Sequence, residues 1–586
     1  MEDKGISIIS LHICRLIIFA LYSSIEISET FKPSEKESFN IVLVDIQKTA
    51  AQEQVCCEEM EFQGSAVRYI TLSYRWGELD EQFVPATDDY FAHVTSFALD
   101  DFYNLCKRIM AEPDLQDIRY VWVDAICVDQ SNNQRKKIVI YRMNDIYKNA
   151  EYIVAIPDLY KEYLIKISDL NRWMSYQIQR YRWHIYHVIQ ENVQEVHRLD
   201  EDWARKLKDR SCQKDESNIL DSEEEDDYIY HRLFDKRNQN KQSLTTEDQF
   251  TGSLFEKRRC RRIGMAIQYL LDLFLDWSRR TWVISEYSIA KEQREGKMKY
   301  WFIHLDKDND FYGKPFFTLD FYRTTPGHIY DNNRWNVDSA SFYHPMIISN
   351  TAHRSFIDMM LRSRATKNED RFHAILPLSP KYNKVKVSKD TISSWNISGM
   401  QSVRLKLYEI LDVEDKLYLL QVCKKQSYTI LPTFASNFDM TLVPLYPYTP
   451  SDTFFEFNFD ITDPSAVYFE SDHLNNSSGY KGPSLHLRPK KYYIHDSLLQ
   501  DMDEAKSYSK VMKKLGFESI DESFEFVTIP SFCTDDESDL TSLYAYPIHL
   551  FGSMNKNVWI ICSFELDDMQ LSPRVHVNKD YVFCVY

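Results

Sequence analysis

Aromatic and acidic side chains follow the ends of two predicted strands. Residues 67–74 (VRYITLSY) and 118–123 (IRYVWV) are short runs of β-branched and aromatic residues, which predict two buried strands. Because ligands of a parallel α/β sheet bind at the carboxyl edge of its strands, we expect the residues at these strand ends to meet in one crevice. Aromatic rings can stack on a planar ligand, and carboxylates can bind hydroxyl groups or stabilise a cation. The candidate binding residues are Tyr74, Arg75, Trp76, Gly77, Asp124 and Asp129.

A third stretch adds a tryptophan and a glutamate. Trp282 and Glu286 lie four residues apart in the predicted helix 279–292, a spacing that puts both on one face. Structural roles are the alternative for these residues. The two tryptophans, Trp76 and Trp282, would then be core aromatics, Asp124 would cap the turn that follows it, and Glu286 would pair with a neighbouring arginine and only hold the helix.

The elements that position these residues alternate between strand and helix. Apolar side chains recur at helical spacing in 97–112 and 131–150, and 151–156 (EYIVAI) predicts a third strand. This βαβαβ succession predicts an α/β fold with a parallel sheet and right-handed crossovers.

A long polar insertion at about 160–260 interrupts the pattern. Within it we expect surface helices over 160–210 and a flexible segment over 211–250, which is too polar to bury much surface. We expect the basic run 257–262 to face the acidic block 223–227 or solvent; the alternatives are contact with nucleic acid and a localisation signal. The pattern then returns, with a helix predicted at 261–277 and a strand at 300–303.

The second half of the chain changes character. Residues 350–430 are predicted to be mostly helical, and 431–586 form a β-rich region with one helix near 499–514. The expected strands there are 453–457, 466–469, 524–528, 557–563 and 580–586. The predicted divisions are an extension over 1–40, a first domain over 41–310, a helical connection over 311–430 and the β-rich region over 431–586.

Glycine is scarce, which excludes several nucleotide-binding classes. The chain has 13 glycines in 586 residues, or about 2%, whereas glycine makes up about 7% of an average protein. Neither GxxxxGK[ST] nor GxGxxG occurs, which argues against P-loop ATPases, Rossmann dehydrogenases and protein kinases. We expect Gly77 to supply backbone freedom in the turn after the first strand.

Charge and cysteine content exclude other partners. A net charge of −18 gives no global excess of cations for nucleic acid, so we expect no nucleic-acid partner. The eleven cysteines form no CxxC pair or zinc-type spacing, and the pair His184 and His187 is expected to lie on a solvated helix. We therefore predict no metal site and no cofactor, and free thiols in a reducing, cytoplasmic setting.

The N-terminus contains an apolar stretch, residues 6–25, long enough to span a bilayer. Arg15 lies at its centre, and Glu2 and Asp3 precede it, where a signal peptide would carry positive charge. We favour a buried or partner-facing helix over a membrane anchor.

Four segments together resemble the fungal heterokaryon incompatibility (HET) family. Residues 69–77 are similar to the family's Y-x-A-L-S-Y-x-W-G, and residues 120–130 are similar to Y-L-W-I-D-x-L-C-I-x-Q. Residues 143–150 are similar to M-x-x-I-Y-x-x-A, and residues 280–286 to R-x-W-x-x-Q-E, in the family's order. Ser285 stands where the last motif usually has Gln. The resemblance covers roughly 41–305, with a weaker echo at 364–371. The four segments are 69–77, 120–130, 143–150 and 280–286.

HET domains look like distant relatives of Toll/interleukin-receptor (TIR) domains, which have a flavodoxin-like parallel sheet with flanking helices. The resemblance implies a role in fungal non-self recognition and cell death. Several TIR domains cleave NAD with a glutamate that follows a tryptophan, so by analogy Glu286 would be catalytic, NAD the substrate, and Trp282 part of its pocket. The alternatives are a signalling module that acts through self-association or protein partners, and a degenerate domain with neither activity.

Overall fold

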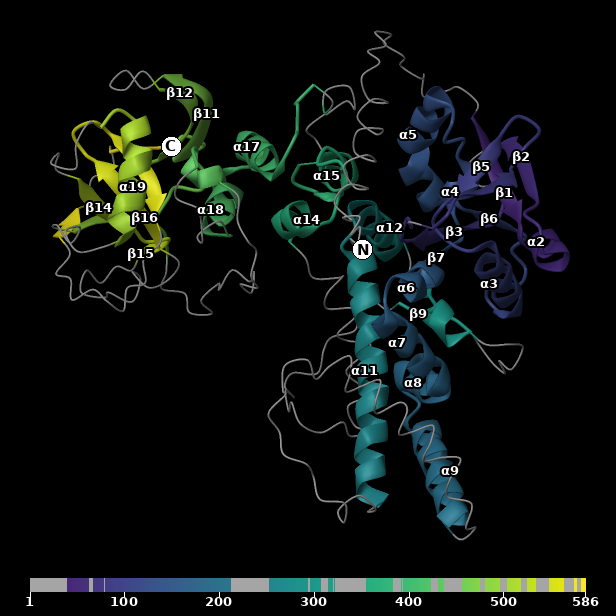
Figure 1. Cartoon of the computed structure of the whole chain (residues 1–586). Helices are drawn as coiled ribbons and strands as arrows, with labels where there is room; N and C mark the ends of the chain where they lie inside the picture. The colour runs from purple at the N-terminus through teal and green to yellow at the C-terminus, as the bar shows by residue number, and fades with distance from the viewer. Residues whose placement is uncertain are drawn as a thin grey trace, which may run out of the picture.

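A computed structural model supplies the structure of the chain (Figure 1). The apolar stretch 6–25 and residues 212–250 of the predicted insertion lie outside the described residues. The structure describes residues 39–62, 67–77, 79–211, 252–293, 296–306, 315–319, 321, 355–382, 392, 394–422, 430–436, 456–474, 480–495, 503–517, 524–533, 547–562, 574–576 and 581–586.

A seven-stranded sheet forms the centre of the N-terminal half. Its order is β2-β1-β6-β3-β7-β8-β9. The four inner strands, β6, β3, β7 and β8, are parallel, as the alternation of strand and helix predicted. The strands are β1 (Asn40–Asp45), β2 (Cys57–Glu61), β3 (Tyr69–Tyr74), β6 (Tyr120–Trp122), β7 (Tyr152–Ile156), β8 (Met298–Tyr300) and β9 (Phe317–Thr318).

The edges of this sheet are antiparallel, a feature that the predicted parallel sheet did not include. Strand β1 pairs antiparallel with both β2 and β6, and β9 pairs antiparallel with β8. Only eleven residues separate β1 from β2, including α2 (Ile46–Gln52). A parallel pair needs a crossover of about a dozen residues or more, so this connection favours the antiparallel arrangement.

Helices α3 (Leu99–Ala111) and α5 (Asn133–Asn149) connect the inner strands, close to the predicted ranges. Helix α3 buries Phe102, Leu105, Cys106 and Ile109, the stripe visible in its sequence. The strand predicted at 300–303 was misplaced, because β8 ends at Tyr300 and a 3-10 turn, η1, occupies Ile303–Leu305. A separate hairpin joins β4 (Gln82–Pro85) to β5 (Phe91–Val94).

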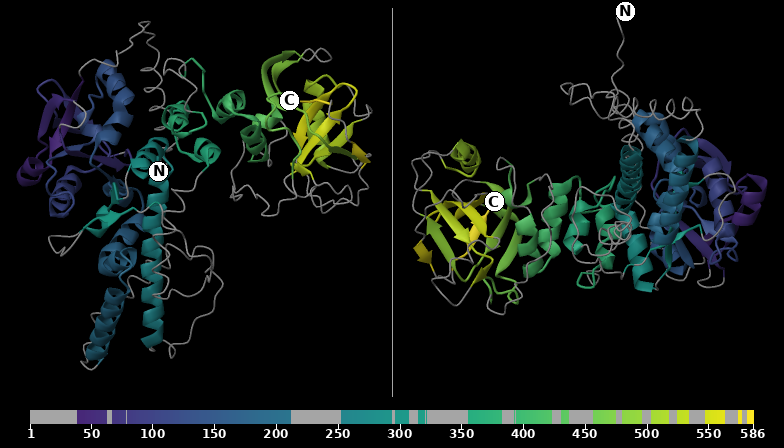
Figure 2. Two further views of the ribbon diagram at one scale, coloured as in Figure 1. Left: turned by 180° about the vertical axis from the view of Figure 1, so that it is seen from behind. Right: turned by 90° about the horizontal axis from the view of Figure 1, so that it is seen from below.

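Residues 161–211 are helical, as predicted, and pack partly against the long helix α11. These helices extend away from the sheet beside α11 (Figures 1 and 2). Helix α11 starts before the predicted residue 261, and α12 follows it after a short turn. The helices are α6 (Lys161–Ile167), α7 (Asp169–Arg180), α8 (Arg182–Ile189), α9 (Val193–Ser211), α11 (Gly252–Ser278) and α12 (Thr281–Gln293).

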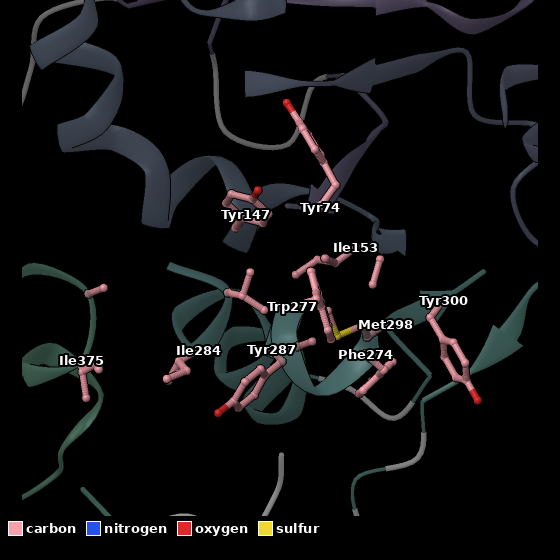
Figure 3. Close-up of a cluster of buried hydrophobic side chains, with 14 of the residues drawn as sticks. Tyr74, Tyr147, Ile153, Phe274, Trp277, Ile284, Tyr287, Met298, Tyr300 and Ile375 are labelled. Carbon is pink, nitrogen blue, oxygen red and sulfur yellow. The ribbon is translucent and has the colours of Figure 1, made fainter. Parts of the chain in front are cut away.

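The corner between α11 and α12 packs tightly against the inner strands. Figure 3 shows Trp277 beside Phe274 and Met298, with Ile284 and Tyr287 of α12 in the same cluster. The indole of Trp277 is fully buried and donates a hydrogen bond to Ser73 Oγ on β3 at 3.0 Å. This packing fixes the start of α12 relative to the end of β3.

The C-terminal half contains helices followed by a β-rich region, in agreement with the predicted change of character. Helices α14 (Phe356–Arg362) and α15 (Asp370–Ala374) lie next to α12 (Figure 1). Helices α17 (Met400–Ile410) and α18 (Val413–Val422) contact β11 (Val467–Leu474).

An eight-stranded sheet forms the β-rich region, in the order β11-β12-β19-β17-β16-β14-β13-β18. Helix α19 (Asp503–Lys514) confirms the predicted helix near 499–514. The described residues of predicted strand 453–457 form β10 (Glu456–Phe457), which pairs with β15 (Phe532–Cys533). The other strands are β12 (Lys481–Leu487), β13 (Tyr492–His495), β14 (Glu525–Ile529), β16 (Ile548–Ser553), β17 (Val558–Cys562), β18 (Arg574–His576) and β19 (Phe583–Val585).

No helix in the described ranges is both long enough and apolar enough to cross a membrane.

Candidate functional site

Asp124 is the centre of a hydrogen-bonded cluster at the carboxyl ends of β3 and β6. It is the first residue of the short helix α4 (Asp124–Cys127). Tyr74, the last residue of β3, donates its hydroxyl to Asp124 Oδ1, and the indole Nε1 of Trp76 donates to Oδ2 at 2.5 Å. The backbone N–H of Ala125 also donates to Oδ1, at 2.9 Å. Both carboxylate oxygens therefore have partners supplied by the two strand ends.

Burial and hydrogen bonding act in opposite directions on Asp124. Burial raises the pKa of the carboxyl, whereas the hydrogen bonds from Tyr74 and Trp76 and the nearby Arg280 charge lower it; the net result is a raised pKa. The same burial, with the Asp124 charge beside it, raises the pKa of Tyr74. The carboxylate thus orients two aromatic side chains.

Trp76 is 41% exposed, so it is not a core aromatic. It stands at the edge of a cavity of about 360 Å³. Four residues predicted from the sequence line this cavity: Arg75, Trp76, Gly77 and Trp282. The remaining lining residues are Asp276, Arg280, Thr281, Arg364, Ala365, Thr366 and Asp370.

Arginine side chains dominate the charge of the cavity wall. The Arg75 guanidinium stacks over the Tyr160 ring, 4.5 Å from its centroid, and pairs with Asp276 at 3.5 Å. Arg364 also pairs with Asp276. Arg75 and Arg364 therefore share one carboxylate at the cavity wall.

The segment 363–371 completes the cavity from a distant part of the sequence. Its backbone is tied to the turn before α12, since Arg364 N–H donates to Arg279 O at 2.6 Å and Thr281 N–H donates to Arg364 O at 3.0 Å. Asp370 accepts a hydrogen bond from Trp282, which opposes the rise that burial causes in its pKa.

Glu286 lies on α12 and is buried, but it is not part of the cavity wall. Its Oε2 atom has no hydrogen-bond partner. Burial is the main reason that the pKa of Glu286 rises to about 7; the Asp124 charge adds to the shift, while Ser73, Tyr147 and Arg280 oppose it. The carboxyl therefore lies near the Asp124 cluster, and Ser73, Tyr147 and Arg280 offset only part of the rise in its pKa.

Asp129 is separated from the other candidates. Its Oδ1 accepts hydrogen bonds from Ser131 N and Oγ at 3.1 and 2.6 Å, in the turn that leads into α5. It lines a different hollow, together with Asp89 and Arg135. The structure thus gives Asp129 a local partner instead of a place beside Trp76.

Gly77 is required by close packing and not by an unusual backbone angle. A Cβ atom at this position would lie 2.6 Å from Ser96 O and 2.8 Å from Ser96 Cα. Among the described residues, the glycines with positive φ are Gly296 and Gly516. The predicted need for glycine holds, but its cause is the Ser96 backbone.

The basic run 257–262 contacts helix α9. Arg259 is buried, pairs with Asp200 at 2.6 Å and stacks over Trp203 at 4.7 Å, and its guanidinium also contacts His184. The acidic block 223–227, with which the run was predicted to pair, lies outside the described part of the chain. Within that part, no three His, Cys, Asp or Glu side chains gather as metal ligands would.

Several residues around the site were not candidates from the sequence. Arg280 lies in a motif segment and was considered only as one of the arginines that could pair with Glu286. No feature of the sequence marks Asp276 as a site residue. Ser73 and Tyr147 lie in motif segments, but only the packing of α12 on β3 and α5 shows that they face Glu286.

Comparison with known proteins gives one match. A family model described as Heterokaryon incompatibility protein (HET) matches residues 69–286. No curated protein and no solved structure matches the chain. The matched stretch starts at the first residue of β3 and ends at Glu286, so it includes the whole Asp124 cluster. Residues 69–286 therefore match the heterokaryon incompatibility (HET) domain family, the family that the four sequence motifs resemble.

Proposed function

We propose that the HET domain hydrolyses the nicotinamide–ribose bond of NAD, as the effector step of a fungal non-self response that ends in cell death. The observation that carries the proposal is Glu286, a buried carboxyl with an unpartnered oxygen and a pKa of about 7, close to a cavity lined by tryptophan and arginine. A perturbed carboxyl beside such a cavity is typical of a functional site.

The strand order supports a TIR-like fold. Numbered by their appearance in the chain, the parallel strands β6, β3, β7 and β8 have the order 2-1-3-4. This is the beginning of the flavodoxin-like order, in which ligands bind where the strand order reverses, next to the first strand. Arg75, Trp76 and Gly77 leave that first strand, β3, and line the cavity.

The chemistry requires one well-placed carboxylate. Cleavage of the bond releases neutral nicotinamide and leaves an oxocarbenium-like cation on the ribose; water adds to it, giving ADP-ribose and a proton. The ionised form of Glu286 would stabilise this cation. Because Glu286 is not part of the cavity wall, the wall must open toward it when the substrate binds.

The test is the release of nicotinamide from NAD by the purified full-length protein. Chromatography measures this release for the monomeric protein and for the self-associated protein. The Glu286→Gln variant should lose activity by about 100-fold or more, since it removes the stabilising charge. The Glu162→Gln variant changes an exposed carboxylate on α6 and should retain full activity. Unchanged activity in Glu286→Gln would refute the catalytic assignment, and no release by the wild type in either state would refute the enzyme proposal.

A further inference from the structure

Arg280 differs from the other cavity arginines. It lines the cavity, but within the described residues its guanidinium makes no hydrogen bond and no ion pair within 4 Å. Burial and the neighbouring Arg75 lower its pKa, while Asp124 and Glu286 attract it from farther away. A partly buried cation without a direct partner is unfavourable, and a bound anion would compensate it.

The acidic residues of the wall are already engaged. Asp276 is shared by Arg75 and Arg364, and Asp370 accepts from Trp282. The cavity wall contains three arginines and two aspartates, so its lining retains one excess positive charge. Asp276 is shared by two arginines, so it cannot accept from all the N–H donors of Arg364. The Arg364 guanidinium therefore keeps donors for another acceptor.

We infer that the cavity binds the phosphate group of a nucleotide through Arg280 and Arg364. Guanidinium groups bind phosphate oxygens in a bidentate manner, and the rings of Trp76 and Trp282 offer stacking surfaces for a base. The cavity volume of about 360 Å³ lies at the small end of the range for ligand pockets. The inference rests on the proposed function and deepens it, since NAD carries a diphosphate.

Arg364 also extends the ligand site beyond the matched domain. It lies 78 residues after Glu286, where the HET match ends, yet its backbone is bonded to Arg279 and Thr281. A ligand phosphate held by Arg280 and Arg364 would therefore contact both the HET domain and the following helical segment.

The test is calorimetric titration of the full-length protein with ADP, adenosine and inorganic phosphate. ADP should bind about tenfold or more tightly than adenosine or inorganic phosphate, because only ADP offers both a base and phosphates. Its affinity should weaken as the salt concentration rises. Equal affinities for ADP and adenosine would overturn the phosphate contact, and phosphate binding as tight as ADP binding would overturn the nucleotide assignment.

Variants test the two arginines directly. Arg280→Gln and Arg364→Gln should each weaken ADP binding by about tenfold to a hundredfold and leave adenosine binding unchanged. Arg172→Gln, an exposed control on α7, should have no effect on either. Arg364 is itself 62% exposed, so its variant remains informative even if Arg280→Gln does not fold.

The outcomes separate this inference from the proposed function. ADP binding that depends on Arg280, with no cleavage of NAD, would support the phosphate site and refute hydrolysis. Cleavage of NAD with a KM unchanged in both arginine variants would support hydrolysis and refute the phosphate site.

Discussion

Asp124 connects the fold to the cavity through two aromatic side chains. Tyr74 is buried and Trp76 is exposed, yet both donate to the same carboxylate. The hydrogen bond from Tyr74 holds the carboxylate, and the carboxylate in turn holds the exposed indole of Trp76 at the cavity edge. At this scale the local order of the site depends on Tyr74.

Tyr74→Phe removes the hydroxyl and leaves Asp124 Oδ1 with only backbone donors. We expect the free energy of unfolding to fall by about 1–3 kcal/mol, because a partly buried charged acceptor loses a partner. Urea denaturation measures this change. Tyr176→Phe, at a side chain that is 51% exposed, is the matched control and should change little. Equal stability of the two variants would contradict the role of Tyr74.

Glu286 makes stability depend on pH in a predictable direction. Its pKa is raised from 4.5 to about 7 in the folded state. Between these values the folded protein keeps a proton that the unfolded chain has released, so the free energy of unfolding falls as pH rises and levels off above about pH 7. The total loss is about 3 kcal/mol, at about 1.4 kcal/mol for each unit of pKa.

Glu286→Gln cannot lose that proton and should lack this contribution. The difference in unfolding free energy between the variant and the wild type should therefore increase in favour of the variant from pH 5 to pH 8. Denaturant unfolding at several pH values measures it, and comparison with Glu162→Gln removes the effect of other titrating groups. A difference that is independent of pH would show that the Glu286 pKa is not raised.

Strand β3 and the loop after it are the elements that determine the shape of the site. Gly77 packs against the Ser96 backbone, which precedes α3. This contact brings the loop that carries Trp76 against the segment that leads into α3. Two neighbouring residues at the start of this loop are therefore held in place, Trp76 by Asp124 and Gly77 by the Ser96 backbone.

Gly77→Ala should be destabilising, because the added Cβ would meet backbone atoms at 2.6–2.8 Å and the backbone cannot move away cheaply. We expect a loss of about 1–3 kcal/mol. Gly399→Ala is the control, since nothing lies within 4 Å of a Cβ at that position. Thermal unfolding followed by circular dichroism compares the two. A Gly77→Ala protein as stable as the Gly399→Ala protein would refute the packing argument.

The elements differ in how well the sequence predicted them. Strands β3, β6 and β7 were found because each is a short apolar run with β-branched or aromatic residues. The antiparallel edges were missed because strand direction depends on the length of the connections and not on side-chain pattern. Hairpin β4–β5 was also missed, since exposed Phe83 and Phe91 obscure its alternation.

At the scale of the whole molecule, the sequence alone could not show which distant segments meet. Tyr74, Trp76 and Asp124 could be grouped because a parallel sheet brings strand ends to one edge. The contact of Arg364 with Asp276 joins segments 88 residues apart and follows from no pattern in either. The separation of Asp129 from Trp76 likewise depends on a local turn that only the structure shows.

Helices α17 and α18 belong structurally with the C-terminal sheet. The guanidinium of Arg404 is buried and donates to Ser436 O, and the Tyr408 ring packs on Phe434 with the centroids 5.2 Å apart. From α18, Gln421 Nε2 donates to Ser531 Oγ at 2.7 Å. These contacts cross from the helical segment into the β-rich region at several points.

A fragment of residues 394–586 should therefore fold cooperatively, whereas a fragment of residues 431–586 should not. The shorter fragment loses the helices that cover Phe434 and leaves Ser436 O without its charged donor, and an uncovered aromatic cluster favours aggregation over folding. Thermal melts followed by circular dichroism, with gel filtration of both fragments, measure the difference. If residues 431–586 alone gave a sharp transition at the same temperature as the longer fragment, α17 and α18 would not be needed for the β-rich region to fold. The β-rich region would then be a folding unit without these helices.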